Sequence, residues 1–136
     1  MRKIAALVST LTLAAGISVL TAGPAAALGG ETYGCQVSPG PVGSYNGNCH
    51  NSAKFHAPYS AGFAVGGAAA GTTYTWHVPA GYQTAPGLCT TGAGCRIDGL
   101  TGDDEVTVSV TLTQDGATET LSATAFILAV CGNVYC

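Results

Sequence analysis

Hydrophobic and polar residues alternate most regularly toward the C-terminal end of the chain. Two runs, residues 105–114 and 117–127, place an apolar residue at every second position, with Thr, Ser or Glu at most positions between. The apolar positions are Val106, Val108, Val110 and Leu112 in the first run and Leu121, Ala123, Ala125 and Ile127 in the second. Asp115-Gly116 between them is a strong signal for a two-residue hairpin turn. A period of two therefore predicts a β-hairpin with one apolar face and one hydroxyl-bearing face.

A shorter alternating run lies earlier, in residues 73–78. Tyr74, Trp76 and Val78 alternate with Thr73, Thr75 and His77, and Pro79-Ala80-Gly81 ends the pattern. Aromatic and β-branched residues with this period indicate a half-buried strand. Weaker signals predict one or two strands within 53–71, a long loop over 82–95, a strand from Arg96 and a turn at 100–104. Residues 126–130 are apolar at consecutive positions, which predicts a strand end covered on both faces.

The elements are short, separated by turn residues and free of helical periodicity after the first 27 residues. They predict an all-β domain built as a two-sheet antiparallel β-sandwich, with a small closed barrel as the alternative. Residues 28–52 are rich in Gly, Ser, Asn and Pro. We therefore expect an irregular N-terminal segment over 28–52, pinned by Cys35 and Cys49, before a β-sandwich domain over 53–136.

The first 27 residues have the order of a secretory signal peptide. Arg2 and Lys3 precede an uncharged apolar stretch over 4–23, and Ala25-Ala26-Ala27 supplies small residues for cleavage. A membrane anchor is the alternative, because the apolar stretch is near spanning length. We expect a cleaved signal helix over 1–27, a mature chain beginning near Leu28, and a secreted, extracellular protein that is not attached to a membrane.

Charge and cysteine content narrow the possible partners and the redox state. After residue 27 only Lys54 and Arg96 stand against seven acidic residues, a net charge of −5, which disfavours nucleic acid and anionic membranes. All six cysteines lie in the same part: Cys35, Cys49, Cys89, Cys95, Cys131 and Cys136. An even count in a small exported chain predicts three disulfides, but fifteen pairings are possible. Short loops (Cys89–Cys95, Cys131–Cys136) and long ties from Cys35 or Cys49 to the C-terminus all remain open.

Two segments resemble known families. GTTYTWHVPAGY followed by EVTVSVTLTQDGATETLSATAF is similar to an immunoglobulin-like domain of the PKD-like sort over about residues 57–130, although His77-Val78-Pro79 stands where PKD domains carry acidic and glycine residues. The resemblance implies an immunoglobulin-like sandwich acting as an extracellular interaction or spacer module. CTTGAGCRIDGL resembles a stapled loop of the neocarzinostatin-group apoproteins, with one more residue between the cysteines. That resemblance implies a small-molecule carrier.

Catalytic and metal chemistry find little support in the sequence. Zinc would need cysteines together with His50, His56 or His77, but structural zinc ligands usually stand two to four residues apart, and the cysteine pairs are spaced more widely. A redox pair would need Cys-x-x-Cys at a helix start. No Gly-x-Ser-x-Gly elbow is present. The acidic residues Asp98, Asp103, Asp104 and Glu105 could hold calcium, but a solvated turn is the simpler interpretation. We expect no enzyme activity and no cofactor.

The loop from Tyr82 to Arg96 is the strongest functional candidate. A disulfide would preorganise it and lower the entropy lost on binding. We expect Tyr82, Pro86, Leu88 and Arg96 to contact a ligand, with Tyr82 and Arg96 being residue types that often dominate interfaces. The alternative is a crossover loop that only stabilises the sandwich. Three functions follow as hypotheses: a monomeric interaction or structural module for a protein or glycan, an inhibitor of an extracellular hydrolase, and a small-molecule carrier.

Overall fold

The structure is a computed structural model that describes residues 28–40, 45, 47–52, 54 and 58–136. The predicted signal peptide 1–27 and His56 lie outside the described residues. The described part is all-β, and no helix in it is long and apolar enough to cross a membrane. Its strands are β1 (Thr32–Ser38), β2 (Cys49–His50), β3 (Tyr59–Gly66), β4 (Thr73–His77), β5 (Gln83–Thr84), β6 (Gly94–Leu100), β7 (Glu105–Gln114), β8 (Ala117–Phe126), β9 (Val130–Cys131) and β10 (Val134–Tyr135).

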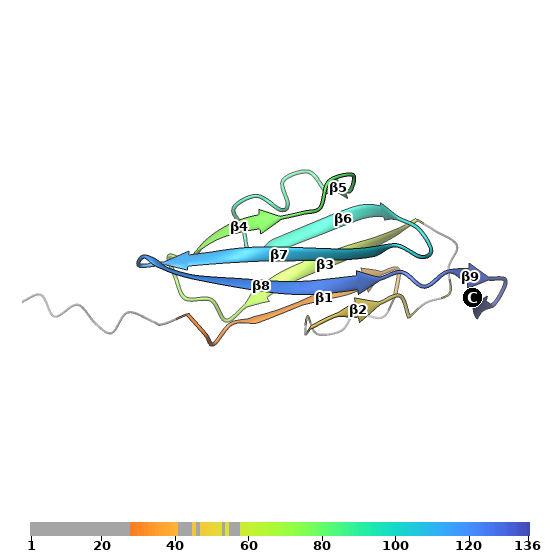
Figure 1. Cartoon of the computed structure of the whole chain (residues 1–136), viewed down its shortest axis with the longest axis horizontal. Helices are drawn as coiled ribbons and strands as arrows, with labels where there is room; N and C mark the ends of the chain where they lie inside the picture. Colours follow the sequence, from red (N-terminus) through yellow and green to blue (C-terminus); the bar gives the residue numbers. More distant parts are fainter. Residues whose placement is uncertain (1–27, 41–44, 46, 53, 55–57) are drawn as a thin grey trace, which may run out of the picture.

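The strands form two four-stranded sheets and a small hairpin (Figure 1). One sheet has the order β1-β3-β6-β5, the other has the order β2-β8-β7-β4, and β9 pairs with β10 beyond the end of β8. The two larger sheets have separate strand orders, as in a two-layer sandwich rather than a closed barrel. All strand pairs are antiparallel except β2–β8, which is parallel. The expectation of purely antiparallel pairing is therefore wrong at β2, an edge strand of two residues.

The long hairpin β7–β8 confirms the prediction from alternation. Val106 pairs with Ala125 and Val108 with Ala123, so the apolar positions of both strands share one face. Asp115 and Gly116 both have positive φ, 49° and 83°, which a tight turn of this hand requires. Strand β4 is likewise confirmed, with Trp76 opposite Val110. The alternation therefore predicted the central strands of this sheet correctly.

The core lies between the two sheets. Buried side chains from both layers form one cluster: Cys35, Val37, Tyr59, Ala61, Phe63, Cys95, Ile97, Leu100, Val106, Val108, Ala123, Ala125 and Ile127. A smaller cluster of Val65, Val110 and Leu112 continues it toward the β7–β8 turn. Burying apolar area of this kind contributes about 25 cal/mol per Å² and is the main force holding the layers together.

Two expectations about the ends of the domain are wrong. Residues 32–38 are not irregular: they form β1, which pairs with β3 along its whole length and buries Cys35 and Val37. The apolar run 126–130 is not covered on both faces, because β8 ends at Phe126 and that side chain is 37% exposed, with Leu128 at 41%. Leu128 instead lies in the link to the β9–β10 hairpin.

All six cysteines are paired within the chain. The bonds are Cys35–Cys49, Cys89–Cys95 and Cys131–Cys136. Three disulfides were expected, and the short loops rather than long ties to the C-terminus are formed. Cys35–Cys49 joins β1 of one sheet to β2 of the other and so fastens one side of the sandwich. Three such bonds are consistent with an oxidising, extracellular environment.

Candidate functional site

The candidate site is the stapled loop, which we define as residues 82–96. It leaves the side of the sandwich at β4, forms the short edge strand β5 and returns as β6 (Figure 1). Ala85 N–H donates to the Arg96 carbonyl at 3.0 Å, which extends the β5–β6 pairing to the base of the loop. Leu88 N–H donates to Ala85 O at 3.1 Å and closes a turn. The loop is therefore hydrogen-bonded along its length, which favours one conformation.

The Cys89–Cys95 bond fixes the tip of the loop to the sheet. Cys95 is 2% exposed on the inner face of β6, whereas Cys89 packs against the core from the loop side. Cys89 N–H donates to Gly94 O at 3.2 Å, and Arg96 N–H donates to Cys89 Sγ at 3.2 Å. Cys89 has a φ of 57°, a backbone conformation uncommon for a non-glycine residue. The disulfide and these bonds together hold Cys89 in it.

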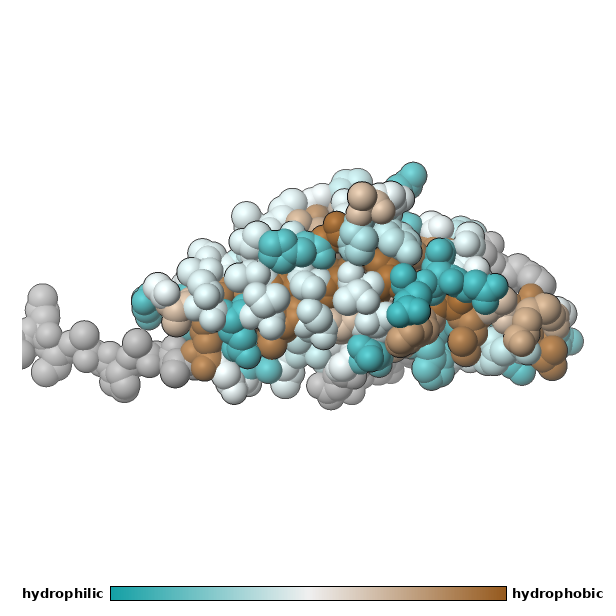
Figure 2. Space-filling view, in the orientation of Figure 1, coloured by the Kyte–Doolittle hydropathy of each residue, from teal (hydrophilic) through white to brown (hydrophobic). Residues whose placement is uncertain are grey.

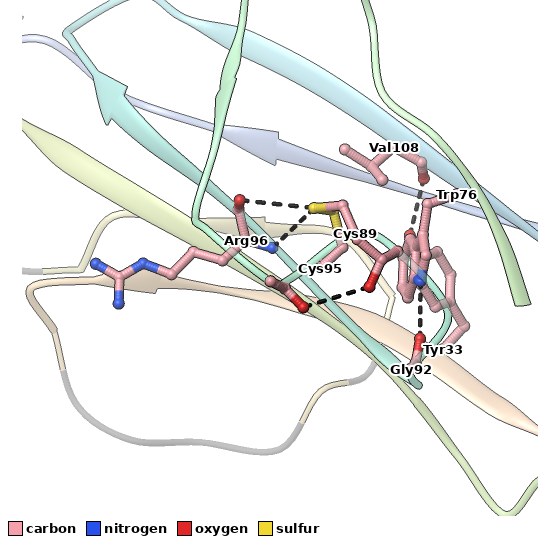
Figure 3. The surroundings of a disulfide bond; sticks show 9 residues. Tyr33, Trp76, Cys89, Gly92, Cys95, Arg96 and Val108 are labelled. Atoms are coloured by element: carbon pink, nitrogen blue, oxygen red, sulfur yellow. Dashed lines mark hydrogen bonds between the residues drawn. A yellow bond between two sulfur atoms is a disulfide. The ribbon is translucent and has the colours of Figure 1, made fainter.

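Trp76 anchors the loop to the opposite sheet (Figure 3). Its indole Nε1 donates to Gly92 O at 2.8 Å, so β4 of one sheet holds the segment that leads into β6 of the other. The Tyr33 ring packs against Trp76 with the centroids 6.1 Å apart and the planes tilted by 47°, and its hydroxyl donates to Val108 O at 2.9 Å. Burial raises the pKa of Tyr33 well above its ordinary value. Tyr33 therefore stays neutral and keeps donating at any ordinary pH.

The predicted ligand-contacting residues do not form one cluster. Tyr82 is half-buried against the core, and its hydroxyl donates to Glu105 O at 3.3 Å. Arg96 points outward from β6 with its side chain 52% exposed, and its Nε bonds Asp98 Oδ1 at 2.7 Å. Pro86 and Leu88 are exposed on the loop itself, with Leu88 at 42%. Thus Pro86 and Leu88 protrude, whereas Tyr82 and Arg96 are engaged with the sandwich.

Two hollows flank the base of the loop, and they meet at Asp98-Gly99. One, of about 290 Å³, is lined by Arg96, Asp98 and Gly99 together with Ser38, Pro39, Pro58, Tyr59 and Ser60. The other, of about 270 Å³, is lined by Gly81, Tyr82, Gln83, Asp98, Gly99 and Asp104. Arg96 lines only the first hollow and Tyr82 only the second, and between them the β3–β6 pairing shifts register at Asp98-Gly99, where Gly99 has a φ of 74°. A glycine inside a strand pattern was the available signal.

The metal and catalytic candidates are dispersed. His77 Nε2 lies 3.1 Å from Thr111 Oγ1 on the outer face of its sheet, and His50 Nδ1 lies 3.1 Å from Asn51 O. In the acidic turn, Asp104 Oδ2 accepts from Thr101 N–H at 2.6 Å and from the Thr101 hydroxyl at 3.1 Å. Within the described ranges, no three His, Cys, Asp or Glu side chains come together as metal ligands would. The Asp104 carboxylate thus acts as a turn acceptor.

The outer face of the β4–β7–β8 sheet carries the hydroxyls that the alternation predicted. Thr107 and Thr124, Ser109 and Ser122, and Thr111 and Thr120 form cross-strand pairs with Oγ–Oγ distances of 2.8–3.0 Å. Figure 2 shows this face as mostly pale, the colour of residues with intermediate hydropathy. In each pair one hydroxyl donates to the other, so these bonds link β7 to β8 on the outer face.

Comparison with protein-family models, with curated proteins and with solved structures found no match.

Proposed function

We propose that the protein is a secreted, non-catalytic recognition module, an immunoglobulin-like β-sandwich that presents the outer side of the stapled loop to a protein or glycan outside the cell. The observation that carries this proposal is the contrast within the loop. Its inner side is fixed by the disulfide and by the bond from Trp76, yet Pro86 and Leu88 stand outside the core.

A fixed loop with a protruding apolar side chain is suited to binding. Burying Leu88 in a partner would gain about 1.5–3 kcal/mol, and little of this would be offset by ordering the loop, since the loop is already ordered. Acidic residues outnumber basic ones in the mature chain, and Arg96 is neutralised locally by Asp98. The surface around the loop therefore favours an apolar or neutral partner, such as a polysaccharide or a hydrophobic pocket of a protein.

Inhibition of an extracellular hydrolase is the second candidate, favoured by the position of Leu88 directly before Cys89. An exposed residue beside a staple can enter a cleft without the loop collapsing. Arg96 is poorly placed for this role, because it lies on β6 and is paired with Asp98. A small-molecule carrier is the third candidate, and the two hollows described above, of about 290 and 270 Å³ beside Asp98-Gly99, are where a small ligand would bind.

Paired variants test the proposal. The mature chain and its Leu88→Ser variant are measured against insoluble polysaccharides and a panel of extracellular proteases, by co-sedimentation and by inhibition. Val134→Ser is the matched control, because Val134 is 58% exposed in the distant β9–β10 hairpin. We expect Leu88→Ser to weaken binding about tenfold or more and Val134→Ser to leave it unchanged. Equal loss in both variants, or no binding to any member of the panel, contradicts the proposed site.

A further inference from the structure

Two oxygen atoms on the inner side of the β7–β8 hairpin are buried without a hydrogen-bond partner. They are Gln114 Oε1 and Glu119 Oε2. Glu119 lies opposite Leu112 on the neighbouring strand, and Leu112 is fully buried, so the Glu119 side chain is on the inward face of the hairpin. Gln114 pairs with Ala117 and is therefore the diagonal neighbour of Glu119 on the same face, within reach of long side chains. Buried polar atoms are almost always paired, so this corner lacks a donor.

The basic side chains of the mature chain are engaged elsewhere. Arg96 is paired with Asp98 at 2.7 Å, and Lys54 lies over the Tyr135 ring at 5.5 Å from its centroid. Tyr135 belongs to β10, at the end of the sandwich opposite the β7–β8 turn (Figure 1). No other Lys or Arg follows residue 27 in the sequence. A donor that also neutralises the Glu119 carboxylate must therefore come from another group.

Leu28 brings the chain to this corner. Its side chain packs on the cluster of Val65, Val110 and Leu112, which Leu121 also contacts. In Figure 1 the segment before β1 lies at the same end of the sandwich as the β7–β8 turn, and β1 then packs along β8. The carboxylate of Glu31 accepts from Gly29 N–H at 2.7 Å and from Gly30 N–H at 3.0 Å, which folds the segment before β1.

We infer that the α-amino group freed at Leu28 by removal of residues 1–27 is the missing donor, and that it bonds the Glu119 carboxylate and the Gln114 amide oxygen. An ammonium has three N–H groups and a positive charge, so it satisfies both acceptors. In the uncleaved precursor the same nitrogen is an amide with one N–H and no charge. Processing then completes the core at this corner, and the precursor is less stable than the mature protein. The inference rests on the predicted cleavage after Ala27 and is independent of what the stapled loop binds.

The test begins with the N-terminal residue of the exported protein, which we expect to be Leu28. A chain beginning at Leu28 is then released from a cleavable fusion, oxidised, and compared with a chain that retains Ala27. The extra residue displaces the ammonium by about 3.5 Å. Each form is also made with the Glu119→Gln substitution, and all four are unfolded in urea. We expect the extension to lower the folding equilibrium constant about tenfold with Glu119 present and less than about twofold in the Glu119→Gln chains.

A second measurement covers the case in which the Glu119→Gln chains fail to fold. The pKa of the α-amino group is obtained from the pH dependence of its labelling in the native chain beginning at Leu28. We expect a pKa above the usual range of about 7.7–8.0, because the nearby carboxylate favours the charged form. An N-terminus elsewhere in the exported protein, an equal effect of the extension with and without the Glu119→Gln substitution, or an ordinary α-amino pKa each overturns the inference.

Discussion

Removing the Cys89–Cys95 bond is the sharpest test of how the stapled loop is held. The change is the double variant Cys89→Ala and Cys95→Ala. The bond closes a loop with a sequence separation of 6, so losing it raises the entropy of the unfolded chain by an amount worth about 2 kcal/mol. Cys95 is 2% exposed, and Ala leaves a small void there that costs about 1 kcal/mol more. The expected loss is about 2–3 kcal/mol.

Urea unfolding followed by fluorescence of the single Trp76 measures that loss, and calorimetry should show a fall in Tm of about 10–20 °C for a domain of this size. The matched control is Cys131→Ala with Cys136→Ala, which opens a loop of similar separation in the exposed β9–β10 hairpin. A loss below about 1 kcal/mol in the Cys89 and Cys95 variant would refute the reasoning. It would show that the backbone bonds alone hold the loop.

Three further predictions follow from single contacts. Tyr33→Phe removes the bond to Val108 O and should cost about 1 kcal/mol at pH 7 in urea unfolding. Burial raises the pKa of the Tyr33 hydroxyl, so the contribution of Tyr33 to stability is complete below its ordinary pKa of about 10 and is lost as the pH rises further. The Phe variant should lack this loss, and equal slopes of unfolding free energy against pH in the two proteins at about pH 9–11 would contradict the prediction. Asn51→Ala breaks two bonds to the Leu128 backbone, at 2.7 and 2.9 Å, and should cost about 2–3 kcal/mol and speed hydrogen exchange in β9–β10. Trp76→Phe should cost about 1–2 kcal/mol and loosen the stapled loop, seen as faster exchange of its amides.

The sequence predicted the elements whose pattern is local. Strands β7 and β8 follow from strict alternation and from the Asp115-Gly116 turn, and the structure confirms their register. Strand β1 has the same alternation at Tyr33, Cys35 and Val37, but flanking glycines and the interpretation of Cys35 as a loop staple concealed it. A cysteine is among the most buried residue types and counts as an apolar position in a strand.

The candidate site was predictable only in part. The Cys89–Cys95 staple follows from short spacing, although its selection among fifteen pairings depends on tertiary placement. The pairing of Cys35 with Cys49 depends entirely on tertiary placement, because the two cysteines lie on edge strands of different sheets, with their Cα atoms 5.5 Å apart. The sequence predicts that Arg96 contacts a ligand. Asp98 stands two positions along the same strand and on the same side, and its carboxylate forms an ion pair with Arg96. That pairing was readable from the sequence.

The two sides of the sandwich are closed in different ways, and the difference bears on whether the stapled loop binds anything. On one side a covalent bond, Cys35–Cys49, joins the sheets. On the other side the sheets are joined by hydrogen bonds from Trp76 to Gly92 and from Tyr82 to Glu105. A bracing role accounts for these inward contacts. Leu88 takes no part in these inward contacts, and its side chain is 42% exposed. Stability should therefore follow Trp76, whereas binding should follow Leu88, and a Leu88→Ser variant that is stable but no longer binds would separate the two roles.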